Sequence, residues 1–275
     1  MKFFTVTTLR NGPVDLVPHW LDHYLRIGVD QFVLCVLREG MEARLDEIRS
    51  MIAGLPAHVH LFSDWTDARQ ELVMRHALDE VGCRPRDWVV RCDVDELNEF
   101  PCPIDVLARA MDKADKAAVH GHFIDRVALE GKLAALAPTP SLARQYPIEC
   151  RLTEKILGGF TQKIMLARHE VTMHPGHHEA SAPSGNHEIG AWQDYRVHHF
   201  KWRDGIMERL DWTLANVAKR DSSWGIETQK FLDFVKPFGR IPVEDPRISA
   251  VEVGEERPRA FARTDCYSVL AGSSG

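Results

Sequence analysis

The 275-residue sequence lacks any apolar run that approaches the ~20 residues of a membrane-spanning helix. It also lacks a basic excess, since 34 Lys and Arg face 40 Asp and Glu, and the net charge of −6 argues against an electrostatic grip on nucleic acid or anionic membrane. The opening residues 1–6 are broken by the turn cluster at 10–13 too soon for a signal peptide. We therefore expect a cytoplasmic protein with no integral membrane segment and no nucleic-acid partner.

The six cysteines form no CxxC pair, and three of them sit in apolar or strand-like stretches. We expect reduced, buried thiols, as in a cytoplasmic protein. Internal repeats and low-complexity tracts are also lacking, and only residues 271–275 have the composition of a flexible linker. With 44% hydrophobic and 27% charged residues, the composition is that of a globular protein with one large domain or two small ones.

Strand and helix patterns alternate through the first 95 residues. Short β-branched runs predict strands at 3–9, 31–37, 58–62 and 88–92, and apolar residues near a 3.6-residue period predict helices at 14–27, 41–52 and 67–81. Asp67 is the expected N-cap of the third helix. This order predicts right-handed βαβ units and an α/β fold with a mostly parallel, twisted sheet flanked by helices.

The pattern loosens after residue 100. We expect helices at 104–111 and 205–219, strands at 117–124, 160–167 and 195–201, a proline-rich loop at 137–147, and helix and loop at 222–239. Seven of the 14 histidines fall between residues 169 and 199, around a polar stretch at 174–190.

The strand at 88–92 ends on three acids, Asp93, Asp95 and Glu96. In an open α/β sheet, ligands lie at the carboxyl ends of strands. Two carboxylates two residues apart need a cation if they are buried, and Mg²⁺ is held by one or two carboxylates together with substrate phosphates. The motif thus points to a metal–diphosphate site, although solvated loop acids or a helix N-cap would give the same tripeptide.

Four segments together resemble glycosyltransferases of the GT-A fold, in the family 2 and family 92-like group. They are Thr7–Asn11 with His19–Asp30, Trp88–Glu96, Gln162–Met165 and Val197–Trp202. Two features depart from that group: Gly12 stands where a glutamate is common, and the second strand ends Val36-Leu37-Arg38-Glu39 instead of in the usual acidic and serine cluster. Glu39 could accept the imide N–H of uracil or thymine in place of that cluster.

The resemblance implies a metal-dependent enzyme that moves a sugar from a nucleoside-diphosphate sugar (UDP, dTDP or GDP) to a hydroxyl of a carbohydrate or small-molecule acceptor, with inversion. It implies Mn²⁺ or Mg²⁺ as cofactor. The catalytic domain would span residues 1–210, with a nucleotide-sugar half at 1–100 and an acceptor half at 101–210. Residues 211–275 would form a helical or irregular C-terminal extension.

In this resemblance Asp95 binds the metal directly, Asp93 holds the metal or the donor ribose, and a late histidine completes the site. Adjacent strand residues point to opposite faces, so only one of His198 and His199 can do so, and His198 is our choice. Residues placed to contact the donor are Thr8, Arg10, Asn11, Glu39, Arg69, Asp93 and Lys163. Arg69 and Lys163 would steady the diphosphate.

Inversion requires a general base for the acceptor hydroxyl. Glu179 and Glu188 lie about 90 residues after the acids, where the fold usually places this base, and Asp125 is a third candidate whose pKa Arg126 could lower by pairing. Trp192, Trp202, Trp212 and Trp224 fit a sugar platform, ordinary packing or the interface of a homodimer. Two other functions stay open: a metal-dependent hydrolase built on the His174–His199 cluster, and a non-catalytic nucleotide-sugar binding protein.

Overall fold

The computed structural model describes residues 1–10, 14–64, 66, 69–181, 187–189, 195–216 and 222–253. The chain divides into two compact units, each built from separate segments. The first contains Met1–His122 and Gln162–Val197, and the second contains Phe123–Thr161 and His198–Pro258. This division cuts across the expected 1–210 domain, whose role as one catalytic unit stays a prediction.

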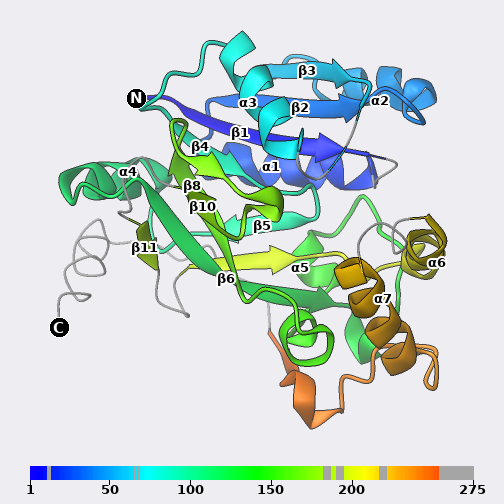
Figure 1. Cartoon of the computed structure of the whole chain (residues 1–275). Coiled ribbons are helices and arrows are strands. Elements are labelled where there is room, and N and C mark those ends of the chain that lie inside the picture. Colours follow the sequence, from blue (N-terminus) through cyan, green and yellow to red (C-terminus); the bar gives the residue numbers. More distant parts are fainter. Residues whose placement is uncertain are drawn as a thin grey trace. The chain divides into compact units, whose positions relative to one another are not determined.

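Four parallel strands form the core of the first unit, in the order β4-β1-β2-β3 (Figure 1). They are β1 (Phe3–Leu9), β2 (Gln31–Leu37), β3 (Ala57–Phe62) and β4 (Trp88–Arg91). The connections contain η1 (Val14–Leu16), α1 (Val17–Arg26), η2 (Glu42–Arg44), α2 (Leu45–Met51) and α3 (Gln70–Glu80). The predicted α/β class and the predicted alternation over the first 95 residues are confirmed.

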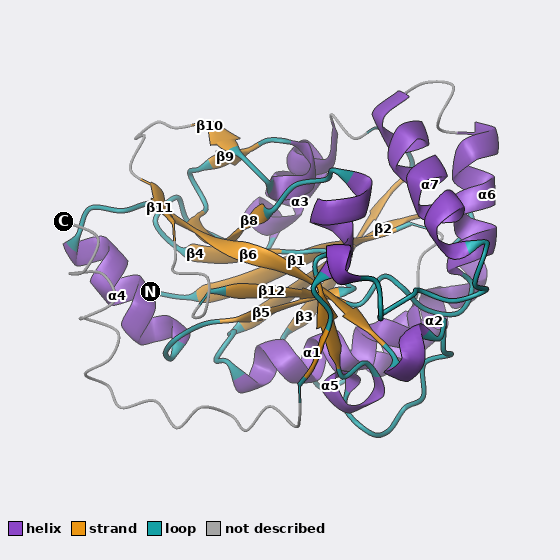
Figure 2. Ribbon diagram, turned by 90° about the horizontal axis from the view of Figure 1, so that it is seen from below, coloured by secondary structure: helices purple, strands orange, loops and turns teal. Residues whose placement is uncertain are grey.

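Helices α1 and α3 cover opposite faces of these strands (Figure 2). Strand side chains alternate between the two faces. On one face a cluster joins the strands to α3; its fully buried members include Phe4, Val6, Val33, Cys35, Met74, Ala77 and Leu78. On the other face Trp20 of α1 meets Phe32 edge-on, with ring centroids 5.7 Å apart, and its indole N–H donates to the Cys92 sulfur at 3.2 Å. Burial on both faces explains why these strands are apolar almost throughout.

Beyond β4 the sheet of the first unit continues with antiparallel strands. β8 (Gln162–Arg168) pairs antiparallel with β4 and with β6 (Ala118–Val127), the strand along which the chain passes into the second unit. The other elements here are β5 (Glu96–Glu99), α4 (Ile104–Lys113), β9 (Thr172–Met173), η6 (Pro175–His177), β10 (Ala180–Ser181), β11 (His187–Ile189) and the start of β12 (Arg196–His199).

The second unit is built around the end of β6, which pairs antiparallel with β7 (Ile148–Cys150), which pairs in turn with β13 (Val251–Glu252). Its helices are η4 (Leu129–Gly131), α5 (Leu142–Gln145), the π-helix η5 (Thr153–Leu157), α6 (Ile206–Asn216), α7 (Ser222–Val235) and η7 (Pro246–Ile248). Trp202 stacks on Phe231, with centroids 4.3 Å apart, at the centre of the apolar cluster that joins these elements.

Several local expectations need correction. The proline-rich loop contains α5, and the strands β5, β7 and β13 are too short to give a periodic signal. Cys35, Cys83, Cys92 and Cys150 are buried free thiols as expected, whereas Cys102 is disulfide-bonded. Asp67 lies outside the described residues. Among the described residues, no helix is both long enough and apolar enough to cross a membrane.

Met74→Ala tests the α3 face of the core. Met74 is fully buried, so its truncation leaves a cavity and lowers the free energy of unfolding by about 2–5 kcal/mol. Leu72 of the same helix is 65% exposed, and Leu72→Ala serves as the matched control, with an expected change within about 0.5 kcal/mol. Urea unfolding of both variants measures the difference, and equal losses would contradict the packing of α3.

Candidate functional site

The acid motif follows directly from β4 in the first unit. β4 ends at Arg91, Asp93 and Asp95 lie in the connection, and Glu96 begins β5. The Asp93 side chain is 41% exposed, while Asp95 and Glu96 are buried. The sequence therefore brings one accessible and two buried carboxylates to the carboxyl end of a central parallel strand, where ligands bind in folds of this class.

Helix α1 fixes the path of this connection. The Tyr24 hydroxyl donates to the Glu96 carbonyl oxygen and accepts from the Asn98 amide, both at 3.1 Å. The Asn98 side chain in turn donates to the Met165 carbonyl oxygen of β8 at 3.2 Å. Tyr24 is fully buried, and its hydroxyl holds the segment after the acids in place.

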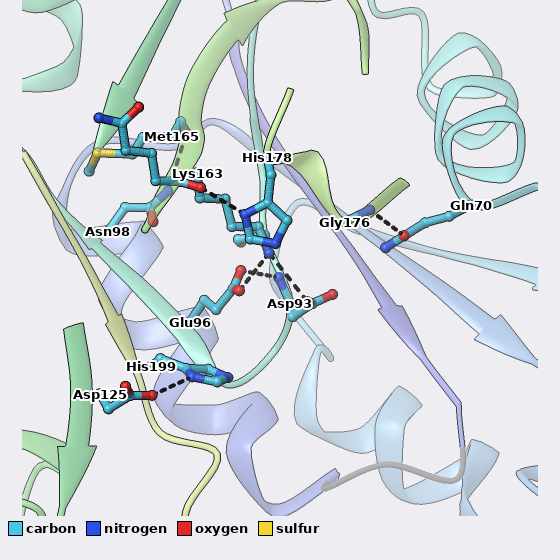
Figure 3. Close-up of polar contacts among 12 residues, drawn as sticks. Gln70, Asp93, Glu96, Asn98, Asp125, Lys163, Met165, Gly176, His178 and His199 are labelled. Atoms are coloured by element: carbon cyan, nitrogen blue, oxygen red, sulfur yellow. Dashed lines mark hydrogen bonds and ion pairs between the residues drawn. The ribbon is translucent and has the colours of Figure 1, made fainter. Parts of the chain in front are cut away.

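Lys163 reaches the acids from β8. The antiparallel register pairs Trp88 with Arg168 and Val89 with Ala167, and its continuation brings position 163 opposite position 93. The Lys163 ammonium lies 2.5 Å from Glu96 Oε1 and 3.3 Å from Asp93 Oδ2, while the Asp93 amide donates to Glu96 Oε2 at 2.8 Å (Figure 3). The two carboxylates thus hold the lysine that the sequence assigned to the diphosphate.

The charges in this cluster do not balance. Burial alone would lower the pKa of Lys163, but the Asp93 and Glu96 charges raise it, so the lysine is cationic. Burial would raise the pKa of Asp93, yet Lys163, His177 and Arg10 bring it well below its usual range. Three carboxylates and one ammonium leave a formal charge of −2 in the motif, which one divalent cation would neutralise.

His177 is fully buried beside this cluster, and neither of its ring nitrogens has a hydrogen-bond partner among the described residues. Burial, reinforced by the Lys163 charge, lowers its pKa to about 3, so the imidazole is neutral. Its backbone φ of +61° lies in the left-handed region, which costs a non-glycine residue about 1–3 kcal/mol. A neutral imidazole whose two nitrogens are unpartnered among the described residues has a lone pair with which it can bind a cation.

The turn that carries His177 is anchored on both sides. The Gly176 amide donates to Gln70 Oε1 of α3 at 3.3 Å, and His178 Nδ1 lies 2.7 Å from the Gln162 carbonyl oxygen of β8 (Figure 3). Gly176 itself has φ +80°, a value that glycine adopts freely. These contacts hold His177 in its strained conformation.

Asp93, Asp95 and His177 fit a divalent cation chemically. Within the described residues the Asp95 carboxylate accepts no hydrogen bond. Carboxylates and a neutral imidazole suit Mn²⁺, and carboxylates alone suit Mg²⁺. The three side chains are not gathered to within the 4.8 Å of one another that marks a preassembled site, so side-chain rotation is needed to bring them onto one ion.

Besides Asp93 and Lys163, two further residues assigned to the donor lie beside the acids. The β1–β4 register pairs Phe3 with Trp88 and Val6 with Arg91, and its continuation brings Thr8 level with position 93. Arg10 acts electrostatically on Asp93. Glu39 is exposed beyond the end of β2, and Arg69 forms an exposed ion pair with Asp64 at the start of α3. Asn11 lies outside the described residues.

His198 belongs to the second unit, where Arg126 approaches its Nδ1 at 3.4 Å and Glu149 lies 3.9 Å away. Arg126 pairs with Glu149 at 3.1 Å, and no pairing of Arg126 with Asp125 is found among the described residues. The metal role of His198 therefore stays a prediction. Sequence reasoning did not single out His177 from the other late histidines, and its burial beside Lys163 and Asp93 appears only in the structure.

Asp125 is the most constrained of the three base candidates. It accepts from the Thr153 amide at 2.6 Å and hydroxyl at 2.7 Å, from Trp202 Nε1 at 2.7 Å, and from His199 Nδ1 at 3.1 Å. Burial would raise its pKa, but these hydrogen bonds, that of His199 foremost, lower it. Four donors occupy both oxygens, an arrangement that holds the carboxylate ionised and binds β6, η5 and the segment after β12 together.

Glu179 is 66% exposed and lies 3.4 Å from His174. Glu188 lies in β11, and its side chain is outside the described residues. Trp202 is a core residue, whereas Trp224, 41% exposed, borders a small hollow of the second unit that Lys201 also lines. Trp212 is exposed, and Trp192 lies outside the described residues.

No family model and no curated protein matches this sequence. Among solved structures the chain is similar to a 4-diphosphocytidyl-2C-methyl-D-erythritol synthase, with 18% identity, 62% of this chain and 76% of that chain covered, and a TM-score of 0.35. The synthase from Anaerococcus prevotii DSM 20548 shows 13% identity, 62% and 70% coverage, and a TM-score of 0.30. Structural similarity at these TM-scores does not identify the reaction that this protein catalyses.

Asp125→Asn tests the carboxylate of the second unit. The asparagine amide meets N–H donors, so the free energy of unfolding at pH 7 falls by about 2–4 kcal/mol. Because the folded pKa of Asp125 is below its ordinary value of about 3.9, its contribution is present above that pH and is lost as the pH falls through the folded pKa. The difference from the natural protein therefore shrinks between pH 7 and pH 3.

Urea unfolding at both pH values measures this effect. Asp211→Asn, at an exposed position of α6, is the control, with a change within about 0.5 kcal/mol at either pH. A difference for Asp125→Asn that stays constant with pH would show that its ionisation does not stabilise this unit.

Proposed function

We propose that this protein is a metal-dependent glycosyltransferase that uses a nucleoside-diphosphate sugar and transfers the sugar with inversion to a hydroxyl acceptor. One observation supports this most: three carboxylates and one lysine lie at the carboxyl end of β4, and the buried His177 interacts electrostatically with two of these groups, Asp93 and Lys163. The cluster has a net negative charge and one accessible carboxylate. These properties suit a cation that is coordinated by the protein and by the phosphates of a donor. This proposal rests on the site and on the resemblance of the sequence motifs.

Asp93, Asp95 and His177 would hold Mn²⁺ or Mg²⁺ in this proposal. His177 would be the late histidine that completes the metal site, in place of His198. The bound cation supplies charge neutralisation at the leaving diphosphate. Because the three side chains are not preassembled, the ion binds weakly alone and more tightly when the donor's phosphates complete its coordination.

Other residues of the chain then orient the reactants. Lys163 keeps Asp93 ionised, and Arg10 and Thr8 lie beside the acids, where the donor nucleotide would extend. The acceptor oxygen forms a bond to the anomeric carbon, the bond from that carbon to the diphosphate oxygen breaks, and the hydroxyl proton passes to a base. Glu179 is our first choice for this base and Glu188 the second, and Asp125 comes last because its hydrogen bonds are already complete.

The hydrolase alternative requires the late histidines to converge on one ion. In the described residues they have separate partners: His174 faces Glu179, His178 faces a backbone carbonyl, and His199 faces Asp125. A non-catalytic binding protein would bind the same nucleotide and metal, so only a measurement of turnover distinguishes this alternative from the transferase.

Asp93→Asn is the test of the donor site. In thermal-shift measurements with UDP, GDP, dTDP and CDP, at least one nucleotide together with Mn²⁺ is expected to raise the Tm of the natural protein more than either alone. The variant loses this joint effect, and release of the nucleoside diphosphate from the matching sugar donor falls by more than about 100-fold.

Asp105→Asn, at a half-exposed position of α4, is the control and keeps the response. The proposal fails if no nucleotide raises the Tm with Mn²⁺, or if Asp93→Asn responds as the natural protein does. Joint binding without release of nucleoside diphosphate would favour the binding-protein alternative.

His177→Asn separates a ligand role from a structural one. Asparagine tolerates the left-handed backbone at this position, so the Tm without ligand is expected to change little. The affinity for nucleotide with Mn²⁺ falls about tenfold or more, because the imidazole is lost. Isothermal titration measures this affinity, with His174→Asn on the same loop as control. A lowered Tm with unchanged affinity would assign His177 a packing role only.

A further inference from the structure

Two histidines of the edge strand β3 and one histidine of helix α3 lie close to a single carboxylate of α3, that of Glu80. Glu80 Oε2 lies 2.8 Å from His60 Nδ1 and 3.4 Å from His58 Nε2, and Glu80 Oε1 lies 3.4 Å from His76 Nε2. The ligand atoms of His58, His60 and Glu80 all lie within 4.8 Å of one another. None of these four residues belongs to the site proposed above, so the cluster needs its own explanation.

The sequence fixes this cluster through two periodicities. His58 and His60 are two residues apart on β3 and therefore point to the same face, as does Phe62. His76 and Glu80 are four residues apart on α3 and therefore share one face of the helix. Phe62 packs in the same apolar cluster as Met74, Ala77 and Leu78 of α3. This buried contact brings the two histidines of β3 close to His76 and Glu80 of α3.

The distances match those of a tetrahedral metal site. Ligands at 2.0–2.2 Å from Zn²⁺ are separated by about 3.3–3.6 Å along the edges of a regular tetrahedron. His58 lies 3.4 Å from Glu80 Oε2, and the contact of His60 with the same oxygen lengthens by about half an ångström on binding an ion. His76 lies 3.4 Å from the other oxygen, Oε1, so its ring has to rotate to reach an ion held by the first three ligands. His76 is 66% exposed, which gives its ring freedom to close the fourth position.

We propose that His58, His60, His76 and Glu80 bind one Zn²⁺ ion, which joins the edge strand β3 to helix α3. Three imidazole nitrogens and one carboxylate oxygen are the donor types that Zn²⁺ takes in proteins. With four protein ligands the site is closed, so its role is structural and independent of sugar transfer.

The alternative is a hydrogen-bonded network without metal. His60 alone satisfies one Glu80 oxygen, and its hydrogen bond is the main cause that lowers the Glu80 pKa. A hydrogen-bonded pair of one histidine and one carboxylate does not require two further imidazoles directed at the same carboxylate. The rings of His60 and His76 also lie close together, with centroids 5.5 Å apart.

Titration of the metal-stripped full chain with Zn²⁺ tests the proposal, by calorimetry and by the visible spectrum of Co²⁺ as a tetrahedral probe. The natural protein is expected to bind one equivalent that raises the Tm by about 5 °C when the free Zn²⁺ concentration is a hundredfold above the dissociation constant. His58→Gln with His60→Gln removes this equivalent, and Glu80→Gln weakens it by at least about tenfold. Mg²⁺ does not replace it.

Two controls separate this site from other zinc-binding groups. His19→Gln, a half-buried histidine of α1, and Asp93→Asn both keep the equivalent. The proposal is overturned if the double variant binds Zn²⁺ with the stoichiometry and affinity of the natural protein. If the double variant does not fold, Glu80→Gln decides: unchanged affinity overturns the proposal, and weakened affinity with an intact response to nucleotide and Mn²⁺ supports it.

Discussion

The buried contact of Lys163 with Glu96 and Asp93 is the interaction on which the first unit's site depends. An acidic side chain that is 2% exposed is stable only beside a cation, and the ammonium at 2.5 Å supplies one. The same contact joins β8 to the end of β4, so it also fixes the register of the antiparallel extension of the sheet. Stability and the charge of the candidate site are therefore determined by one group.

Much of the first unit could be predicted from the sequence, because its strands are buried on both faces and its helices are amphipathic. Residues 3–9 and 31–37 gave the observed bounds of β1 and β2. The position of Asp93, Asp95 and Glu96 at the carboxyl end of β4 could also be predicted. A buried apolar strand that is followed by charged residues ends where the sheet meets solvent. Local composition determines both features.

Other parts depend on contacts between residues distant in the sequence. Lys163 is 67 residues from Glu96, and only the pairing of β8 with β4 reveals that it neutralises the acids. His177 has no local signal beyond the preceding glycine; its burial and its two unpartnered nitrogens appear only in the folded chain. Asp125 looked like a candidate base from its neighbours in sequence, yet donors from two distant segments, at residue 153 and at residues 199–202, complete its hydrogen bonds.

The separation between the acids and their lysine has a consequence for synthesis. Asp93 leaves the ribosome 70 residues before Lys163. Until β8 has emerged, the nascent chain holds its acids in water, since their desolvation without a counter-ion is unfavourable. The first unit therefore completes its sheet only after the second unit's first segment, Phe123–Thr161, has been translated, which makes the assembly of the candidate site a late event in the life of the nascent chain.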